Sequence, residues 1–362
     1  MQNLHLERIG KSREMNEKNK FFVEKITAWY RKHHRKLPWR NTQDPYLIWL
    51  SEIILQQTRV KQGLPYYQKF VENYPNLQDL ALANDMEVFR LWQGLGYYNR
   101  AKNMLATARQ LCEKNEGQFP KSYRELLKLK GIGKYTAAAI ASFAFNEPVA
   151  VLDGNVYRVL ARYFGIFTDI ASPQGEKEFR ALAQSLIPEN SNEYNQAIME
   201  FGALQCTPQK PNCMFCPLQE NCFAFVYQEQ ENLPVKINKT QMRERFFAYL
   251  VWHKEEKIAL KKRLEKDIWQ NLYDFDLQEK ENLYELEQIP LVKGSFIHKS
   301  SIFKHQLTHQ RIFVCFFHFE INENFPLSPN LEWHTWEDIQ NLPKPILIAN
   351  YLQTWQTKNL QG

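Results

Sequence analysis

Residues 129–136 read LKGIGKYT and lead directly into the small-residue stretch TAAAIA. Apolar residues at helical spacing lie on both sides, so Gly131 and Gly133 indicate a tight turn between two helices. Such glycines leave backbone N–H groups uncovered at the start of the second helix, where the helix dipole favours an anion. Lys130 and Lys134 add positive charge, and a nucleic-acid phosphate, held without sequence preference, suits this arrangement. The alternative is a structural turn without a ligand.

The composition is that of a folded protein. The chain has 362 residues, 44% of them hydrophobic, and a net charge of +6. This length allows two or three domains with a sizeable core, and the positive charge is compatible with a polyanionic partner. No apolar run reaches the roughly 18 residues of a membrane span, and the N-terminus lacks the apolar segment of a secretory signal. We therefore expect a cytoplasmic protein without a membrane segment.

The hydrophobic pattern divides the chain into segments. From about residue 21 to 225 apolar residues recur at helical spacing, as in PYLIWLSEIILQQTRV at 45–60. Residues 226–243 are polar and uneven, which is typical of a linker. Beyond them, alternating runs rich in Phe, Ile and Val predict strands before a final helix. The sequence therefore predicts a flexible extension at 1–20, an all-helical domain at 21–225 and a smaller α+β domain at 244–362.

Four of the six cysteines form one cluster with the spacing C-x6-C-x2-C-x5-C, namely Cys206, Cys213, Cys216 and Cys222. A local cluster without a signal peptide predicts a metal site rather than disulfides. Four thiolates can bind zinc or an iron–sulfur cluster. Zinc modules usually carry two CxxC pairs, and the segment 206–222 has one, so the spacing favours a [4Fe–4S] cluster over zinc. Cys112 and Cys315 are expected to have no ligand role.

Two carboxylates stand in contrasting settings. Glu52 lies inside the apolar stretch WLSEIILQQT at 49–58. Burial there would raise the pKa of its carboxyl and keep a proton available near neutrality. Asp153 stands at the start of a predicted helix, where backbone amides favour its ionised form. The alternatives are a solvent-exposed helix position for Glu52 and a simple N-cap for Asp153.

Several motifs together resemble a known enzyme superfamily. The GIG hairpin, LDGNV at 152–156 and the cysteine spacing are similar to the helix-hairpin-helix DNA glycosylases with a [4Fe–4S] cluster, the endonuclease III superfamily. Within it, LPWR at 37–40, WLSEIILQQTRV at 49–60 and QGLGYYNRA at 93–101 resemble the MutY family of adenine DNA glycosylases. This resemblance runs from about Lys36 to the C-terminus. It implies a monomeric bacterial base excision repair enzyme that removes adenine paired with 8-oxoguanine or guanine in double-stranded DNA and leaves an abasic site.

The resemblance also assigns roles to single residues. Glu52 would protonate adenine N7, Asp153 would face the sugar, and Tyr135 and Asn155 would position water and the Asp153 carboxylate. The other implied contacts are the adenine pocket (Trp39, Arg40, Glu200), the residues that enter the duplex or touch the opposite base (Gln57, Thr58, Leu95, Tyr97, Thr308, His309) and the backbone hairpin (Gly131, Gly133, Lys134). The lyase branch has its catalytic lysine at position 135, so tyrosine there implies a monofunctional enzyme. A bifunctional glycosylase/lyase and a catalytically silent DNA-binding protein are the rival interpretations.

The C-terminal domain resembles the Nudix-like domain of the same family. It lacks the acidic REx2Ex2G motif, so we expect no nucleotide hydrolase activity. In the family this domain reads 8-oxoguanine with a loop of the form FxHxFSH, and residues 303–309 read FKHQLTH. Thr308 keeps the hydroxyl and His309 the imidazole, whereas Leu307 stands where an aromatic residue is usual.

One of the adjacent tyrosines Tyr97 and Tyr98 is expected to be exposed.

Overall fold

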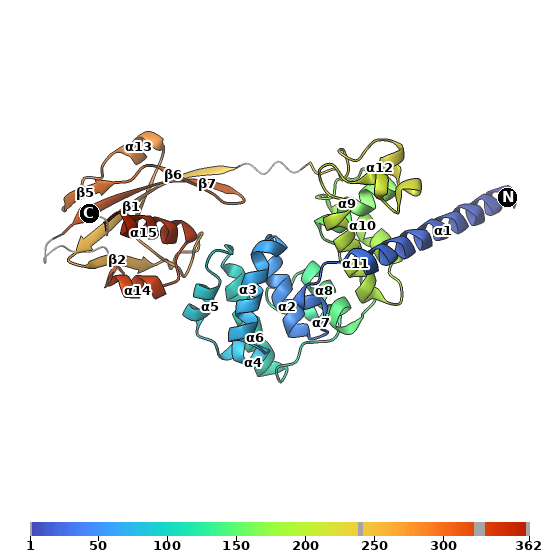
Figure 1. Cartoon of the computed structure of the whole chain (residues 1–362), viewed down its shortest axis with the longest axis horizontal. Helices are drawn as coiled ribbons and strands as arrows, with labels where there is room; N and C mark the ends of the chain where they lie inside the picture. Colours follow the sequence, from blue (N-terminus) through green and yellow to red (C-terminus); the bar gives the residue numbers. More distant parts are fainter. Residues whose placement is uncertain (1, 238–241, 322–329, 360–362) are drawn as a thin grey trace. The chain divides into compact units, whose positions relative to one another are not determined.

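The computed structural model describes residues 2–237, 242–321 and 330–359, with side chains placed from residue 17 to residue 357 (Figure 1). Part of the expected linker, 238–241, lies outside these residues. The chain forms two compact units. The first combines residues 1–60, 74–81 and 106–238, and the second combines residues 61–73, 82–105 and 239–362.

The part of the chain before the linker is helical, as the sequence predicts. Its helices are α1 (Gln2–His33), α2 (Pro45–Leu55), α3 (Val60–Asn73), α4 (Leu77–Leu82), α5 (Asp85–Leu91), α6 (Asn99–Lys114), α7 (Tyr123–Leu126), α8 (Lys134–Phe145), α9 (Gly154–Phe164), α10 (Pro173–Ser185), α11 (Ser191–Leu204) and α12 (Phe223–Val226), with short 3-10 helices η1 (Pro38–Arg40), η2 (Cys213–Phe215) and η3 (Gln219–Asn221). Helix α1 includes residues 2–20 of the expected extension, whose flexibility stays a prediction. No helix in the described residues is both long enough and apolar enough to span a membrane.

The structure divides the helix that the sequence predicts over 45–60. Helix α2 starts with Asp44 as N-cap and Pro45 at its first position, and it ends at Leu55. Two residues later Gln57 has a φ of 58°, the left-handed conformation, which cannot continue a right-handed helix. A new helix, α3, then begins at Val60. The residues after α2 therefore form a turn that presents side chains at the end of a buried helix.

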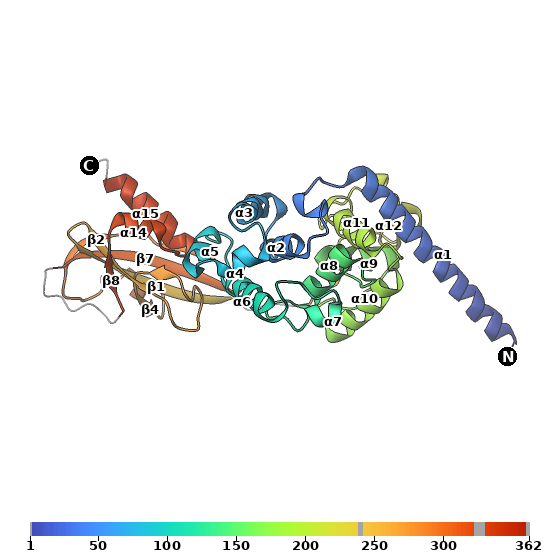
Figure 2. The same ribbon diagram turned by 90° about the horizontal axis from the view of Figure 1, so that it is seen from below.

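Helix α8 occupies the centre of the first unit, in contact with both α2 and α11 (Figure 2). Its residues from Thr136 to Phe143 are all buried. Because most of them are small, neighbouring helices can approach closely without leaving cavities. The helix ends where Asn146 takes the left-handed conformation. The small-residue stretch after the GIG hairpin is thus the element around which this unit packs.

The second unit contains a mixed β-sheet with the strand order β3-β2-β1-β7-β5. Its strands are β1 (Arg243–Lys254), β2 (Lys257–Lys262), β3 (Tyr273–Asp274), β4 (Asp276–Lys280), β5 (Ser295–Lys299), β6 (Phe303–Gln306), β7 (Gln310–Glu320) and β8 (Glu332–His334), and its helices are α13 (Leu283–Glu287), α14 (Trp336–Asn341) and α15 (Ile346–Asn359). The central strands β1 and β7 are parallel, whereas their pairings with β2, β4, β5 and β6 are antiparallel. The predicted α+β class of this region is confirmed.

Both faces of the sheet are covered, as the alternation of side chains along β1 shows. Phe247, Tyr249 and Val251 pack with apolar residues of α14 and α15 on one face (Figure 2). Ala248 and Leu250 point to the other face, where α13 packs. Successive side chains of a strand point to opposite faces, so a strand that is apolar on both sides must lie in the middle of the sheet.

The close packing of α9 against α11 generates a stability prediction. A Cβ at Gly202 on α11 would lie 2.6 Å from the Asn155 Cβ and 3.0 Å from its carbonyl oxygen, whereas a Cβ at Gly154 has no neighbour within 4 Å. Gly202→Ala should therefore lower the free energy of unfolding by about 1–3 kcal/mol, because overpacking forces the helices apart. Gly154→Ala is the matched control and should change stability little. Denaturant unfolding of both variants, followed by tryptophan fluorescence, distinguishes the two cases.

Candidate active site

Glu52 is a buried carboxyl in the middle of α2. Only 7% of its surface is exposed, and its neighbours along the helix are apolar. Burial, together with the charge of Asp153, raises the pKa of Glu52 to about 7, although a hydrogen bond from the Tyr135 hydroxyl and the charge of Arg40 act in the opposite direction. A buried carboxyl favours its neutral form because ionisation in a dry site is costly. The predicted burial of Glu52 and the rise in its pKa are therefore present.

Asp153 caps α9 and lies half-buried. Its Oδ1 accepts a hydrogen bond from the Val156 N–H at 2.8 Å, and its Oδ2 accepts one from Asn155 Nδ2 at 2.7 Å. Burial raises the pKa of the Asp153 carboxyl, and these hydrogen bonds oppose that rise. The sequence predicts only the stabilising contribution of the helix amides. Desolvation outweighs it because the cap is turned towards the interior.

Tyr135 connects the two carboxylates. It is the second residue of α8, and its hydroxyl donates a hydrogen bond to Glu52. Burial and the nearby charges of Glu52 and Asp153 keep the pKa of Tyr135 well above its usual value, so the hydroxyl remains a neutral donor. The structure thus brings together Glu52, Tyr135, Asp153 and Asn155 from α2, α8 and α9, as the sequence predicted.

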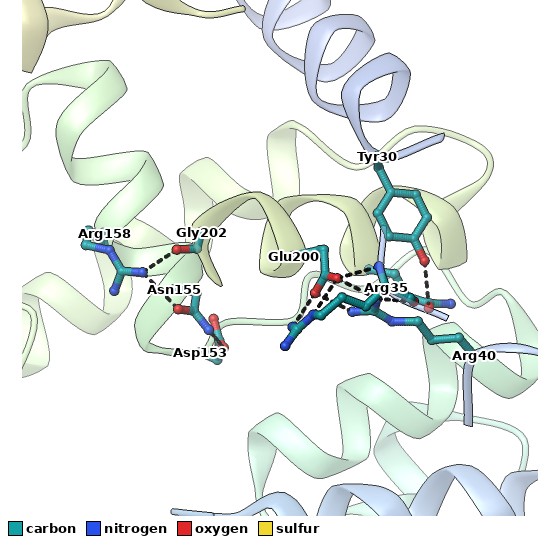
Figure 3. Close-up of polar contacts among 9 residues, drawn as sticks. Tyr30, Arg35, Arg40, Asp153, Asn155, Arg158, Glu200 and Gly202 are labelled. Atoms are coloured by element: carbon teal, nitrogen blue, oxygen red, sulfur yellow. Dashed lines mark hydrogen bonds and ion pairs between the residues drawn. The ribbon is translucent and has the colours of Figure 1, made fainter. Parts of the chain in front are cut away.

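An arginine that sequence reasoning missed supports this group. The Arg158 guanidinium donates to Asn155 Oδ1 at 2.9 Å and to the Gly202 carbonyl at 2.6 Å (Figure 3). It also donates to the Cys206 carbonyl at 2.7 Å. The planar fork of arginine suits several such acceptors at once. The sequence does contain a signal for it, because Arg158 stands among the apolar residues of VYRVLARYF. The structure explains this position by the buried polar network that Arg158 forms. Through Asn155, Arg158 connects the Asp153 carboxylate to α11 and to the first cysteine of the cluster.

Glu200 on α11 is almost fully buried, with 1% of its surface exposed, and two arginines surround it (Figure 3). Arg35 donates to it at 2.6 and 2.8 Å, and Arg40 at 2.7 and 2.9 Å. Burial alone would raise the pKa of Glu200, but these hydrogen bonds outweigh burial and lower the pKa to about 2. Of the expected adenine-pocket residues, Arg40 and Glu200 are therefore paired with each other, and Trp39 lies half-buried beside them in η1. Arg35 was not predicted.

The hairpin before α8 has the predicted geometry. Gly131 has a φ of 76°, and Gly133 is the N-cap of α8 with no side chain bonded to the first turn. Free N–H groups at a helix N-terminus favour an anion. Lys134 is exposed and forms an ion pair of 2.5 Å with Glu176 on α10. Gly131, Gly133 and Lys134 thus lie on the surface, as backbone contacts require.

Four of the six residues expected to meet the duplex lie in two turns, one in each unit. In the first unit, Gln57 is exposed and Thr58 half-buried in the turn after α2. In the second, Tyr97 has a φ of 48° and is 46% exposed, whereas Tyr98 is 9% exposed, which confirms that one tyrosine is buried and the other is not. Leu95 is buried at the start of this second turn.

A cavity of about 560 Å³ lies within the second unit. Its walls are the turn 94–99, the loop 266–270 and the hairpin 305–310, and they include Leu95, Tyr97, Thr308 and His309. Thr308 and His309 are exposed at the tip of the hairpin between β6 and β7. Leu307 also lines the cavity, and it packs against the apolar core beneath it. Four of the six residues predicted to meet the duplex therefore share one cavity.

The four clustered cysteines line a single small cavity of the first unit, of about 30 Å³, together with apolar residues and Arg162. None of them forms a disulfide. Within the described residues, no three Cys, His, Asp or Glu side chains converge as ligands of one metal ion. A four-iron cluster instead takes one thiolate on each iron, so its ligands surround it rather than meet at a point. Arg162 donates to the Thr207 and Pro208 carbonyls and lies 3.5 Å from Cys206 Sγ.

Comparison with known proteins identifies the class first. Residues 50–189 match the HhH-GPD superfamily of base excision DNA repair proteins, and residues 247–354 match the NUDIX domain. The solved structure of a thermostable thymine-DNA glycosylase is 32% identical, with a TM-score of 0.55 over 59% of this chain and 99% of that one. An endonuclease III–DNA complex at 22% identity has the same fold, with a TM-score of 0.51 over 58% and 96%. The chain is a DNA N-glycosylase of the base excision repair class.

Its sequence relatives show to which family within this class of DNA N-glycosylases the chain belongs. The chain is 35% identical to the adenine DNA glycosylase of Buchnera aphidicola subsp. Acyrthosiphon pisum, across 91% of this chain and 97% of that protein. It is 37% identical to the adenine DNA glycosylase of Buchnera aphidicola subsp. Baizongia pistaciae, across 90% and 94%. It is also 41% identical to human adenine DNA glycosylase, across 59% and 41%. The chain belongs to the adenine DNA glycosylase family.

The buried Glu52 carboxyl generates a pH-dependent stability prediction. Its pKa rises from the ordinary 4.5 of a glutamate to about 7 in the folded chain, so the folded state binds more protons than the unfolded state between these pH values. Stability should fall as pH rises through this window. Glu52→Gln, which cannot ionise, should therefore be more stable than the wild type at pH 8, by up to about 3 kcal/mol, with no gain near pH 4.5. Denaturant unfolding at both pH values measures the difference. The exposed Glu113→Gln is the control, and an equal gain in both variants would contradict the burial argument.

Proposed function

We propose that this chain removes adenine paired with 8-oxoguanine or guanine in double-stranded DNA. It hydrolyses the N-glycosidic bond and leaves an abasic site. The observation that carries this proposal is the buried Glu52 carboxyl, which shares a hydrogen bond with Tyr135 and lies near Asp153. Its family membership supports the choice of adenine, since the relatives named above are adenine DNA glycosylases.

The two carboxylates divide the chemistry. Adenine leaves readily only when a ring nitrogen is protonated, and a carboxyl with a pKa of about 7 holds a proton at neutral pH and can still release it. The sugar develops positive charge as the bond breaks, and a carboxylate facing it stabilises that charge. We assign the first role to Glu52, with N7 of adenine as the acceptor, and the second to Asp153. Asn155 and Tyr135 hold these groups and the attacking water in place.

The enzyme is proposed to be monofunctional. A lyase needs an amine that attacks the sugar, and position 135 holds a tyrosine whose hydroxyl is bonded to Glu52. The adjacent Lys134 is exposed and paired with Glu176. The rival bifunctional glycosylase/lyase has no observation in its favour at these positions.

DNA must be distorted for the adenine to reach a buried site, because the target base has to leave the stack. Gln57 and Tyr97, both exposed on turns with positive φ, are proposed to enter the duplex. Thr58, Leu95, Thr308 and His309 are proposed to contact the opposite base, and Trp39, Arg40 and Glu200 to line the adenine pocket. Gly131, Gly133 and Lys134 would bind the backbone at the start of α8.

The four cysteines around this cavity are the donor set that a [4Fe–4S] cluster takes. Cys206, Cys213, Cys216 and Cys222 would hold it, because all four line one small cavity and none is used in a disulfide. When bound, the cluster would supply a structural cross-link, since hydrolysis of a glycosidic bond needs no electron transfer. The chain's own Arg162 holds the loop carbonyls of Thr207 and Pro208 in place.

We also propose the wider organisation. The enzyme acts as a cytoplasmic monomer, the helical glycosylase domain ends near residue 225 and the Nudix-like domain begins near residue 244. The matched families, at 50–189 and 247–354, are compatible with these boundaries.

Single-turnover adenine excision tests the assignment. The wild type should release adenine from duplexes with 8-oxoguanine or guanine opposite, but not with thymine, and strand cleavage should appear only after alkali. Glu52→Gln should lower the excision rate at least about 100-fold, the usual contribution of a general acid. Above pH 7 the wild-type rate should fall as the carboxyl ionises, approaching about tenfold per pH unit. Glu113→Gln should keep the wild-type rate and profile.

Two outcomes would contradict this assignment. A wild-type rate in Glu52→Gln would remove Glu52 as the acid. Strand cleavage without alkali, with a covalent adduct trapped by borohydride, would favour the lyase instead.

Iron and sulfide analysis tests the cluster. The wild type should contain about four irons and four sulfides per chain. Cys213→Ser should lose most of them, whereas Cys112→Ser, outside the cavity, should keep them. Zinc in place of iron in protein purified without oxygen would refute the assignment.

A further inference from the structure

Trp269 lines the cavity of about 560 Å³ in the second unit, and it is not among the residues predicted from the sequence. It lies in the loop between β2 and β3 and is half-buried. Its ring centroid is 5.9 Å from that of His305 and 6.1 Å from that of Phe247, whose ring it meets nearly edge-on. The cavity therefore has an aromatic surface beside the polar tip formed by Thr308 and His309.

The backbone of Trp269 is unusual. Its φ is 61°, in the left-handed region, which a bulky side chain rarely adopts. Such a conformation persists only when the surrounding contacts determine it. Residues in this conformation are common at functional sites, where a side chain must be held in one position. Leu272 N–H donates to the Trp269 carbonyl at 3.1 Å, and Asn271 N–H donates to the Arg263 carbonyl at 2.8 Å, which closes the loop.

Two buried arginines hold this loop in place. Arg263 Nε donates to the Ile268 carbonyl at 3.2 Å, next to Trp269. Asp267 accepts from Arg245 at 2.9 Å and from Arg263 at 3.3 Å. Arg245 in turn donates two hydrogen bonds to the Glu279 carboxylate on β4. A loop that is closed by its own Arg263 and tied through Arg245 to β1 and β4 can hold a ring rigidly at a cavity wall, which favours binding because little freedom is lost.

The chemistry of the cavity suits a nucleobase. Trp269 and Tyr97 provide flat aromatic surfaces, and Thr308 and His309 provide hydrogen-bonding groups at an exposed tip. Leu307 contributes no ring, and both Leu307 and Trp269 pack in part against the apolar core beneath the cavity. A planar base is bound through stacking on aromatic side chains, which tolerates any base, and through hydrogen bonds, which distinguish one base from another.

We propose that Trp269 is the stacking surface for the base opposite the target adenine. This inference rests on the proposed function. In it Trp269 supplies affinity for a purine opposite the adenine, and the Thr308–His309 tip supplies the distinction between 8-oxoguanine and guanine.

The test compares three duplexes that differ only opposite the adenine, with 8-oxoguanine, guanine or an abasic residue there. Binding is measured with a 2′-fluorinated adenosine that resists hydrolysis. Trp269→Leu should weaken binding to the two purine duplexes by roughly 5- to 150-fold, the range for one lost stacking contact, and to the abasic duplex by less than about twofold. Trp269→Phe should retain most of the affinity. Tyr284→Leu, exposed on α13 outside the cavity, should bind all three like the wild type.

The abasic duplex separates a contact from a folding defect, because it needs the same folded protein but offers no base. An equal loss on all three duplexes would overturn the proposal and make Trp269 structural, and so would unchanged binding to all three. If instead the wild type excises no adenine from any of the duplexes in the hydrolysable form, the proposed function itself fails.

Discussion

The burial of Glu52 is the constraint on which the helical unit depends. A carboxyl among the apolar side chains of α2 cannot ionise cheaply, and the charge of Asp153 makes ionisation harder still. Two other helices must therefore bring polar groups close to Glu52. Helix α8 supplies the Tyr135 hydroxyl, and α9 supplies Asp153 at its N-cap. The small residues of α8 allow this approach, because larger ones would hold its neighbours away. The burial of the Glu52 carboxyl costs free energy, but it leaves that carboxyl with a proton at neutral pH.

Arginines hold the surroundings of these carboxylates. Arg158 ties the start of α9 to the end of α11 and to the cysteine loop. The missing side chain of Gly202 leaves the space in which Asn155 approaches α11. Arg35 and Arg40 neutralise the buried Glu200, which would otherwise be a costly isolated charge. A buried ion pair contributes more to a defined geometry than to stability, and a defined geometry is what positioned acid chemistry requires. The same device recurs in the second unit, where Arg245 and Arg263 hold the loop of Trp269.

Local patterns were sufficient for much of the fold. Helical periodicity located the helices of the first unit, and alternation located the strands β1 and β7, because those patterns record which face of an element is buried. The helix predicted over 45–60 failed at one place. Gln57 adopts a left-handed backbone that its residue type does not announce, so the turn that exposes it was invisible in the sequence. The direction of the Asp153 pKa was also missed, since the N-cap was visible but the burial that opposes it was not.

The sequence by itself determined the helical and α+β regions, the cysteine spacing and the residues that the family resemblance selects. Each of these depends only on a local sequence pattern or on a motif. Only the tertiary structure decided which charges meet. The pairing of Glu200 with Arg35 and Arg40 joins residues far apart along the chain, and so does the contact of Glu52 with Tyr135. The place of Trp269 at the wall of a cavity is of the same kind. The physical reason is that burial and electrostatic environment belong to the packed chain: a carboxyl has its altered pKa only once other helices have removed the water around it.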